Sequence, residues 1–270
     1  MKKLGIIFLS CFLLFPLNAA AKVYWVGRNI VISPDGAKDT KMLTALGHSY
    51  LILIPNNPKR AKAISPSYAK YEKSLGCNKR GVVIGAYLSQ GSEQPGGKDG
   101  NLEAQINAAR EEVPTRDFLC GTVAQKKKWN FVSGTVKSDL DDAQFIKKLL
   151  DRAEDYIAVT RTTPVDYHSV RSVLDGISAS NNLAQNCNSF AFSLLAYSEA
   201  SQAPDIGAKR DLPGNRHLLP QYLFFRTPII QPAGYVPKVV KNDNAYRKRV
   251  QAARELRDAI NNYQFPISPF

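Results

Sequence analysis

Apolar residues along the first third of the chain predict strands in three places, the first of which, residues 23–32, holds one or two strands. Residues 23–32 carry β-branched and aromatic positions and run into a Ser-Pro-Asp-Gly turn at residues 33–36. Residues 47–55 and 81–88 are near-continuous apolar runs, a pattern typical of buried strands. We expect the polar, lysine-rich span between these two runs to be an excursion from a hairpin-like pair, and residues 91–100 to be a loop.

The middle of the chain predicts helices. Apolar residues recur at helical spacing over residues 102–113, which favours a helix that Pro114 ends. The clearest helical pattern covers residues 139–156, with acidic residues in its first turn and one apolar face. Residues 129–136 indicate a strand between the two helices. The pattern of residues 165–174 is ambiguous.

A further buried helix is expected from residue 188, ending before Pro204. Prolines then separate short apolar pieces that would wrap the domain, and a basic amphipathic helix is expected over residues 244–263. A packing role for this last helix is favoured over a membrane-surface role, because no large aromatic face opposes its basic one. We expect one domain over residues 22–240 and a C-terminal helical extension over residues 241–270.

The start of the chain has the pattern of an export signal. Two lysines precede an apolar run over residues 4–17, and small residues follow up to Ala21. We therefore expect residues 1–21 to be a signal peptide and the mature protein of 249 residues (270 − 21) to be periplasmic or secreted. The run is shorter than the roughly 20 residues of a spanning helix, so no transmembrane segment is expected. A lipoprotein site at Cys11 is disfavoured, because the apolar run continues past it.

Composition and charge narrow the class of protein. A hydrophobic fraction of 44% and a charged fraction of 22% are ordinary for a globular protein and argue against disorder, collagen and coiled coil. The chain has 36 Lys and Arg against 23 Asp and Glu, a net charge of +13. Outside the cytoplasm such a charge favours an anionic envelope polymer over nucleic acid as partner. The basic residues are scattered, so nonspecific solubility explains the charge equally well, and the oligomeric state is not indicated.

Cleavage after Ala21 would leave an odd number of cysteines, namely Cys77, Cys120 and Cys187. Cys77 and Cys120 each lie beside a glycine at the border of a loop, which favours a disulfide between them in an oxidising compartment. Cys187 is then the unpaired thiol.

The position of Cys187 directly ahead of a helical pattern suits a nucleophile. Backbone amides at a helix N-terminus lower the pKa of a thiol and can stabilise the oxyanion of an acyl-transfer intermediate. The base would be one of three histidines. We favour His48, which follows a glycine at the start of a buried strand, over His217 in a turn-rich loop and His168 in the ambiguous segment.

These residues resemble the motifs of the permuted papain-fold hydrolases. This group includes the PPPDE peptidases, the lecithin retinol acyltransferase-like enzymes and circularly permuted relatives of NlpC-type wall peptidases. The resemblance is carried by Gly47 and His48 opening an apolar strand, and by Asn186, Cys187 and Phe190 in an Asn-Cys-x-x-Phe pattern opening a helix. As in those families, the histidine precedes the cysteine. The motifs cover about a tenth of the chain.

The resemblance implies an α+β, permuted papain-like (NlpC-type) fold, with an antiparallel sheet packed against helices and with insertions. It implies Cys187 as nucleophile and His48 as general base and later acid. A third polar residue on the strand after the histidine is common in the group. Tyr87, Ser89 and Gln90 occupy that region, but none stands out, so a dyad is expected.

Other site classes find little support in the sequence. There is no His-x-x-x-His, Cys-x-x-Cys, phosphate-binding loop or serine elbow, so no metal or cofactor is expected. We expect an exported cysteine hydrolase that cleaves amide bonds, with peptidoglycan peptides as the first substrate class. The alternatives are a lipid or thioester acyl hydrolase or acyltransferase on the same fold, and a noncatalytic envelope-binding protein with Cys187 buried.

Overall fold

A computed structural model describes residues 22–31, 42–89, 100–167, 185–206, 218–227 and 235–244, and the single positions 229, 251 and 255. The expected signal peptide, the turn at residues 33–36, His168 and His217 lie outside these residues. So do nearly all of the loop at residues 91–100, and most of the ambiguous segment at residues 165–174 and of the helix expected over residues 244–263.

An antiparallel sheet forms the centre of the molecule, and its three middle strands match the three apolar runs of the sequence. Strands β3, β4, β2, β1 and β6 lie in this order, and β5 pairs with β4 over residues 84–88, beyond the residues 79–81 that pair with β3. The strands are β1 (Lys22–Val31), β2 (Met42–Ile54), β3 (Lys73–Gly76), β4 (Lys79–Leu88), β5 (Leu102–Ile106) and β6 (Val132–Thr135). The expected α+β class, with an antiparallel sheet packed against helices, is confirmed.

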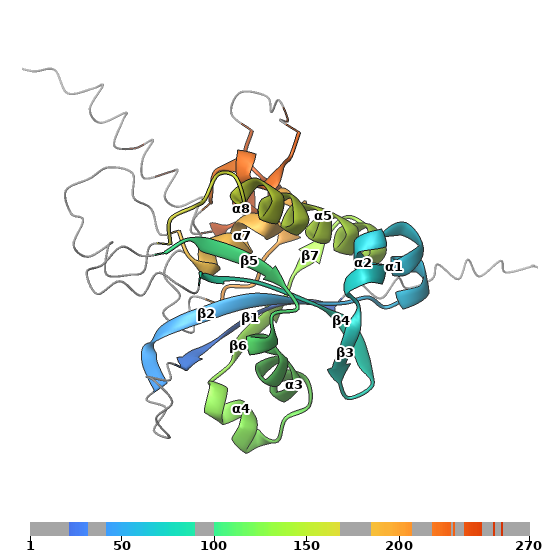
Figure 1. The fold of residues 1–270 in the computed structure, drawn as a ribbon, viewed down its shortest axis with the longest axis vertical. Coiled ribbons are helices and arrows are strands. Elements are labelled where there is room, and N and C mark those ends of the chain that lie inside the picture. The colour runs from blue at the N-terminus through green and yellow to red at the C-terminus, as the bar shows by residue number, and fades with distance from the viewer. Residues whose placement is uncertain are drawn as a thin grey trace, which may run out of the picture.

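Helices cover both faces of the sheet (Figure 1). On one face lie α5 (Asp142–Thr160) and α7 (Cys187–Tyr197), the two helices that the sequence predicts most clearly. On the other face lie α3 (Glu112–Cys120) and α4 (Val123–Trp129). The shorter elements are α1 (Pro58–Ile64), α2 (Pro66–Tyr71), η1 (Ala109–Glu111), β7 (Lys137–Ser138), β8 (Ala200–Gln202), η3 (Gln221–Phe224) and α8 (Lys238–Lys241).

Strand β2 reads as a continuous apolar run because both of its faces are buried. Leu51 and Leu53 belong to the larger core, which includes Phe190 of α7. Tyr50 and Ile52 point to the opposite face, where Phe118 of α3 packs against the smaller core. Since side chains alternate along a strand, His48 lies on the same face as Tyr50.

The helix predicted over residues 102–113 is wrong. Residues Leu102–Ile106 form β5, in which Leu102 and Ala104 are buried and Glu103 between them is exposed. Apolar residues four apart fit a strand as well as a helix, because four is also a multiple of the two-residue repeat of a strand. Pro114 does not end a helix but lies in the first turn of α3, where the missing N–H costs no hydrogen bond.

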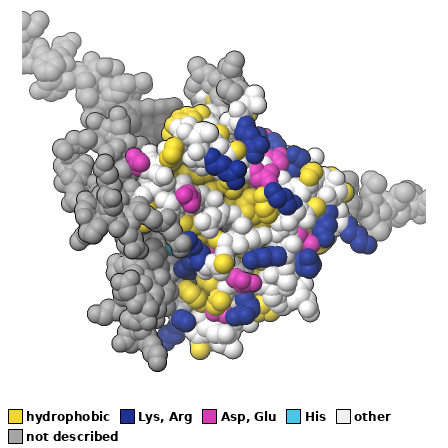
Figure 2. All heavy atoms as spheres, viewed as in Figure 1, with side chains coloured by type: hydrophobic (Ala, Val, Ile, Leu, Met, Phe, Trp, Pro, Cys, Tyr) yellow, Lys and Arg dark blue, Asp and Glu magenta, His cyan; other side chains and the backbone are white. Residues whose placement is uncertain are grey.

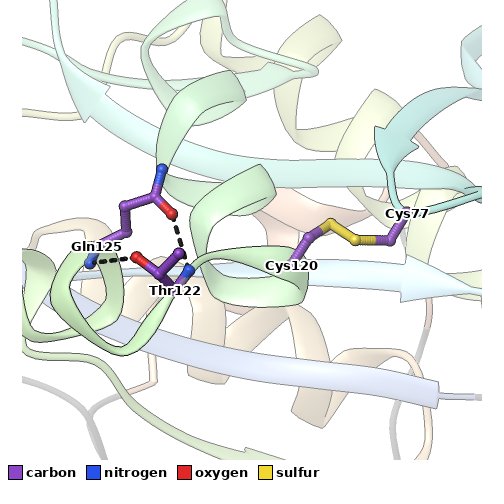
Figure 3. Close-up of a disulfide and its surroundings, with 4 residues drawn as sticks. All are labelled: Cys77, Cys120, Thr122 and Gln125. Carbon is purple, nitrogen blue, oxygen red and sulfur yellow. Dashed lines mark hydrogen bonds between the residues drawn. A yellow bond between two sulfur atoms is a disulfide. The ribbon is translucent and has the colours of Figure 1, made fainter.

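The strand predicted over residues 129–136 is shorter than expected. Trp129 is the last residue of α4, and Asn130 follows it with a left-handed backbone, so that the strand covers only Val132–Thr135. At its other end α4 begins with a capping box, in which Thr122 and Gln125 each accept a hydrogen bond from the backbone N–H of the other (Figure 3).

Cys77 and Cys120, the pair predicted from the sequence, form a disulfide with their Cα atoms 5.9 Å apart (Figure 3). Cys77 lies in the turn between β3 and β4, and Cys120 is the last residue of α3. The bond therefore ties the β3–β4 hairpin to α3. None of the described helices combines the length and apolarity needed to cross a bilayer.

Candidate active site

The start of α7 is fixed by a capping box. The side chain of Asn186 accepts hydrogen bonds from the backbone N–H groups of Asn188 (2.9 Å) and Ser189 (3.2 Å), and the Ser189 hydroxyl accepts one from the N–H of Asn186 (2.8 Å). Cys187 is consequently held as the first residue of the helix.

This end of α7 lies against the end of β2. Strands β2 and β4 are paired up to Tyr50 and Gly85, and no pairing between them follows toward His48. The Asn188 side-chain amide donates to the carbonyl of Gly47 (3.3 Å), and the backbone N–H of Ser49 donates to the Cys187 sulfur. These contacts bring the two sequence-predicted residues together, and Cys187 and His48 are hydrogen-bonded to each other.

Glu111 stands at the imidazole. Its Oε1 lies 3.2 Å from His48 Nε2, a distance at which the two form an ion pair, although the N–H direction does not meet hydrogen-bond geometry. Because Nε2 faces Glu111, Nδ1 is the ring nitrogen available to the sulfur. The arrangement is Cys187, His48 and Glu111, in the order of a nucleophile, a base and an orienting carboxylate.

Arg28 holds the carboxylate from the other side. Its Nε donates to Glu111 Oε2 (3.0 Å) and its Nη2 to Oε1 (2.5 Å), a bidentate contact. Arg28 and His48 are direct partners in the β1–β2 register, so two neighbouring strands present a cation and an imidazole to one buried carboxylate.

Aromatic rings fix the plane of the imidazole. His48 stacks with Tyr87 (ring centroids 5.1 Å apart) and with Tyr50 (6.0 Å). Gly85 makes room for this arrangement, because a Cβ on it would lie 2.5 Å from the Tyr87 hydroxyl. The guanidinium of Arg110 covers the Tyr87 ring at 4.3 Å.

The charges of the site stabilise one another. Burial disfavours the imidazolium, but Cys187 and Glu111 outweigh it and raise the pKa of His48 to about 9. Burial also disfavours the thiolate, but His48, the Ser49 N–H and Arg28 lower the pKa of Cys187. Glu111 likewise is buried, yet His48 and Arg28 lower its pKa to about 2. The site therefore favours a thiolate next to an imidazolium more than an isolated cysteine and histidine would.

The thiol is not open to bulk solvent. Cys187 is 3% exposed and His48 is 6% exposed. A cleft of about 500 Å³ reaches Glu111, but neither Cys187 nor His48 lines it. A substrate can reach the sulfur only after the groups that cover it have moved.

Comparison of the chain with protein-family models, curated proteins and solved structures finds no match. Within the described ranges no cluster of three or more His, Cys, Asp or Glu side chains is arranged to hold a metal ion.

Sequence reasoning found the thiol and the imidazole but missed Glu111. Of the candidates for the third position, Tyr87 contacts the imidazole only through its ring, the Ser89 hydroxyl accepts from the N–H of Asn101, and Gln90 lies outside the described residues.

Glu111 was missed because its segment was predicted to be the end of an amphipathic helix. No local pattern distinguishes a buried Glu from an exposed one. The one feature that could have indicated Glu111 is Arg28, a buried cation that needs a carboxylate partner. Arg28 lies opposite His48 only through the β1–β2 register, which the sequence alone does not give.

Proposed function

We propose that this protein is a cysteine hydrolase that cleaves amide bonds, built on a permuted papain-like arrangement. The observation that carries the proposal is the contact of the Cys187 thiol with an imidazole that is itself ion-paired with a buried carboxylate. This combination lowers the pKa of the thiol and raises the fraction of thiolate, which a cysteine packed only for its size does not need.

In the proposed reaction the Cys187 thiolate attacks the carbonyl carbon of the substrate, and the negative charge moves to the carbonyl oxygen. The backbone N–H of Cys187, which unlike those of Asn188 and Ser189 does not donate to the Asn186 side chain, would stabilise that oxygen. The intermediate collapses as the carbon–nitrogen bond breaks, and His48 gives its proton to the departing amine. A water molecule, deprotonated by His48, then hydrolyses the acyl-thioester and restores the free thiol.

Glu111 and Arg28 support this cycle without touching the substrate. The carboxylate stabilises the imidazolium and directs Nε2 toward itself, so that Nδ1 remains turned to the sulfur. Arg28 keeps the carboxylate ionised and fixed by two hydrogen bonds.

Peptidoglycan peptides are the substrate class that we propose first. An exported protein with a net charge of +11, which is the +13 of the whole chain less Lys2 and Lys3, would be attracted to anionic wall polymers. Basic side chains are spread over the face shown in Figure 2 and are mixed with acidic ones, so this attraction would be general rather than directed by one patch. The proposed substrate class is supported by the expected export of the protein and by its net charge. The proposed amide hydrolysis is supported by the residues of the site.

A substrate screen separates these claims. Purified sacculi, peptide amides and phospholipids are incubated with the wild type, Cys187→Ala and His48→Ala, and products are identified by mass. We expect turnover of a peptide substrate that both substitutions reduce by a factor of at least about 10³. Turnover of phospholipid alone would indicate a lipid acyl hydrolase and not an amide hydrolase. Turnover that survives either substitution would contradict the mechanism.

The low exposure of Cys187 favours a second candidate, a noncatalytic envelope-binding protein. In that case an aldehyde or chloromethyl ketone peptide would not form an adduct with Cys187, while sacculi would still bind the wild type and Cys187→Ala equally. Adduct formation that depends on His48 would exclude this candidate.

A further inference from the structure

A cleft lies on the α3 side of the sheet, away from the thiol. It has a volume of about 500 Å³, within the range of small-molecule sites. One wall comes from β3 and Val83 of β4, and the other comes from η1 and the first two turns of α3. The disulfide Cys77–Cys120 joins these two walls beside the cleft, so its shape is covalently held.

The lining combines apolar and charged side chains. Its apolar groups come from Leu75, Val83, Ala108 and Val113. Val113 is the most exposed of these four, at 46%.

Two cations of the lining lack carboxylate partners. Lys73 and Arg116 line the cleft, and neither forms an ion pair in the part of the chain that the structure describes. Of the two acids of the lining, Glu111 is already bound by Arg28, so that the exposed Glu112 is the one carboxylate of the lining that offsets the two cations. The balance of charge therefore favours an anion, and the apolar side chains favour methylene groups.

We propose that this cleft binds a single-chain anionic amphiphile, such as a medium-chain alkyl carboxylate. The carboxylate would contact Arg116 and Lys73, and the alkyl chain would lie against Leu75, Val83 and Val113. A free carboxylate is favoured over a bilayer lipid, because a volume of about 500 Å³ fits a single small molecule and not a membrane surface. The proposal does not depend on the hydrolase activity proposed above.

The occupant would lie directly behind the residue that orients His48. Glu111 lines the cleft on one side and contacts His48 Nε2 on the other. The cleft is thus a second site, coupled to the thiol site by a single buried side chain.

Decanoate tests the proposal by titration calorimetry with the whole protein, below its micelle concentration. We expect saturable one-to-one binding that weakens about tenfold in Arg116→Ala and in Lys73→Ala, because each loses one charge-assisted contact. Ala109→Trp, at an exposed position of the lining, should abolish binding by filling the cleft. Lys79→Ala, which removes a charge from the same hairpin outside the cleft, should leave the affinity unchanged.

Two matched ligands complete the test. Decyltrimethylammonium has the same chain with the opposite charge, and decanol has no charge. Both should bind at least about tenfold more weakly than decanoate. The proposal is overturned if decanoate fails to bind the folded wild type, if Ala109→Trp binds as well as the wild type, or if the cationic ligand binds equally well. Circular dichroism of each variant separates loss of binding from loss of fold.

Discussion

Glu111 decides the charge state of the site at the level of single residues. A carboxylate without any exposed surface is stable only when its charge is compensated, and Arg28 and His48 provide that compensation from adjacent strands. The thiol benefits in turn, because the imidazolium that Glu111 stabilises is the cation nearest to the sulfur. Removing Glu111 should therefore affect two properties, the titration of His48 and the stability of the fold.

Glu111→Gln is expected to lower the pKa of His48 from about 9 toward its ordinary value, since one of the two anions that raise it is lost. It should also cost about 3 kcal/mol of unfolding free energy, because Arg28 is left buried without its anion. An NMR titration of His48 and urea unfolding measure the two effects. Glu112→Gln, at the exposed neighbouring position, is the control and should change neither.

The lowered pKa of Glu111 also predicts a dependence of stability on pH. The carboxyl titrates at 4.5 in the unfolded chain and at about 2 in the folded protein, so its contribution is complete above pH 4.5 and disappears as the pH falls toward 2. Unfolding free energies measured between pH 6 and 2 should fall less steeply in Glu111→Gln than in the wild type. Parallel curves would mean that the carboxylate is not stabilised in the folded state.

At the level of elements, the sequence predicts those helices and strands whose form depends on a local pattern. It does not predict an element whose form depends on pairing with a distant strand. Helices α5 and α7 were predicted because apolar residues at helical spacing and, for α5, acidic residues in the first turn are local features. Strand β5 was mistaken for a helix because its pairing with β4, which comes from a distant part of the chain, overrides an ambiguous spacing. This single error also concealed η1 and Glu111.

Gly85 is expected to be essential for the placement of Tyr87. Gly85→Ala introduces a Cβ 2.5 Å from the Tyr87 hydroxyl, so the ring must shift from its stack with His48, at a cost of about 1–3 kcal/mol. In a Tyr87→Phe background the same change should cost less, because the closest atom is gone. Equal costs in both backgrounds, measured by urea unfolding, would place the Tyr87 ring elsewhere.

The disulfide is expected to be the main stabiliser of the α3 side of the sheet. It closes a span of 43 residues, and its removal in Cys77→Ser/Cys120→Ser should cost about 4 kcal/mol in the loop-entropy treatment. Thermal unfolding of the oxidised wild type and of the double variant measures this difference. Cys187→Ser is the matched control, since it removes a thiol without opening a loop. A loss below about 1 kcal/mol would show that α3 is held by packing alone.

At the scale of the whole molecule, the central sheet brings the residues of the candidate active site together. Arg28 and His48 come from strands that read as ordinary core, Cys187 comes from a helix on one face, and Glu111 comes from the segment that leads into α3 on the other. Patterns within short stretches of sequence were enough to predict the α+β fold class, the central strands and the pairing of Cys187 with His48. The carboxylate, the cleft and the burial of the thiol could not be predicted in this way, because each depends on residues that are far apart in sequence.

The proposed hydrolase mechanism depends on the charge state of Cys187 and His48. A pH profile of Cys187 alkylation tests this charge state most directly. The rate of labelling by iodoacetamide, followed by mass mapping of Cys187, is measured from pH 4 to 10 in the wild type and in His48→Ala. We predict that the thiolate of the wild type forms at a pH below the ordinary thiol range, with a second change near pH 9 when His48 loses its proton, and that His48→Ala loses this downward shift. An identical profile in both proteins, with one step in the ordinary thiol range, would contradict the ion pair and with it the proposed hydrolase.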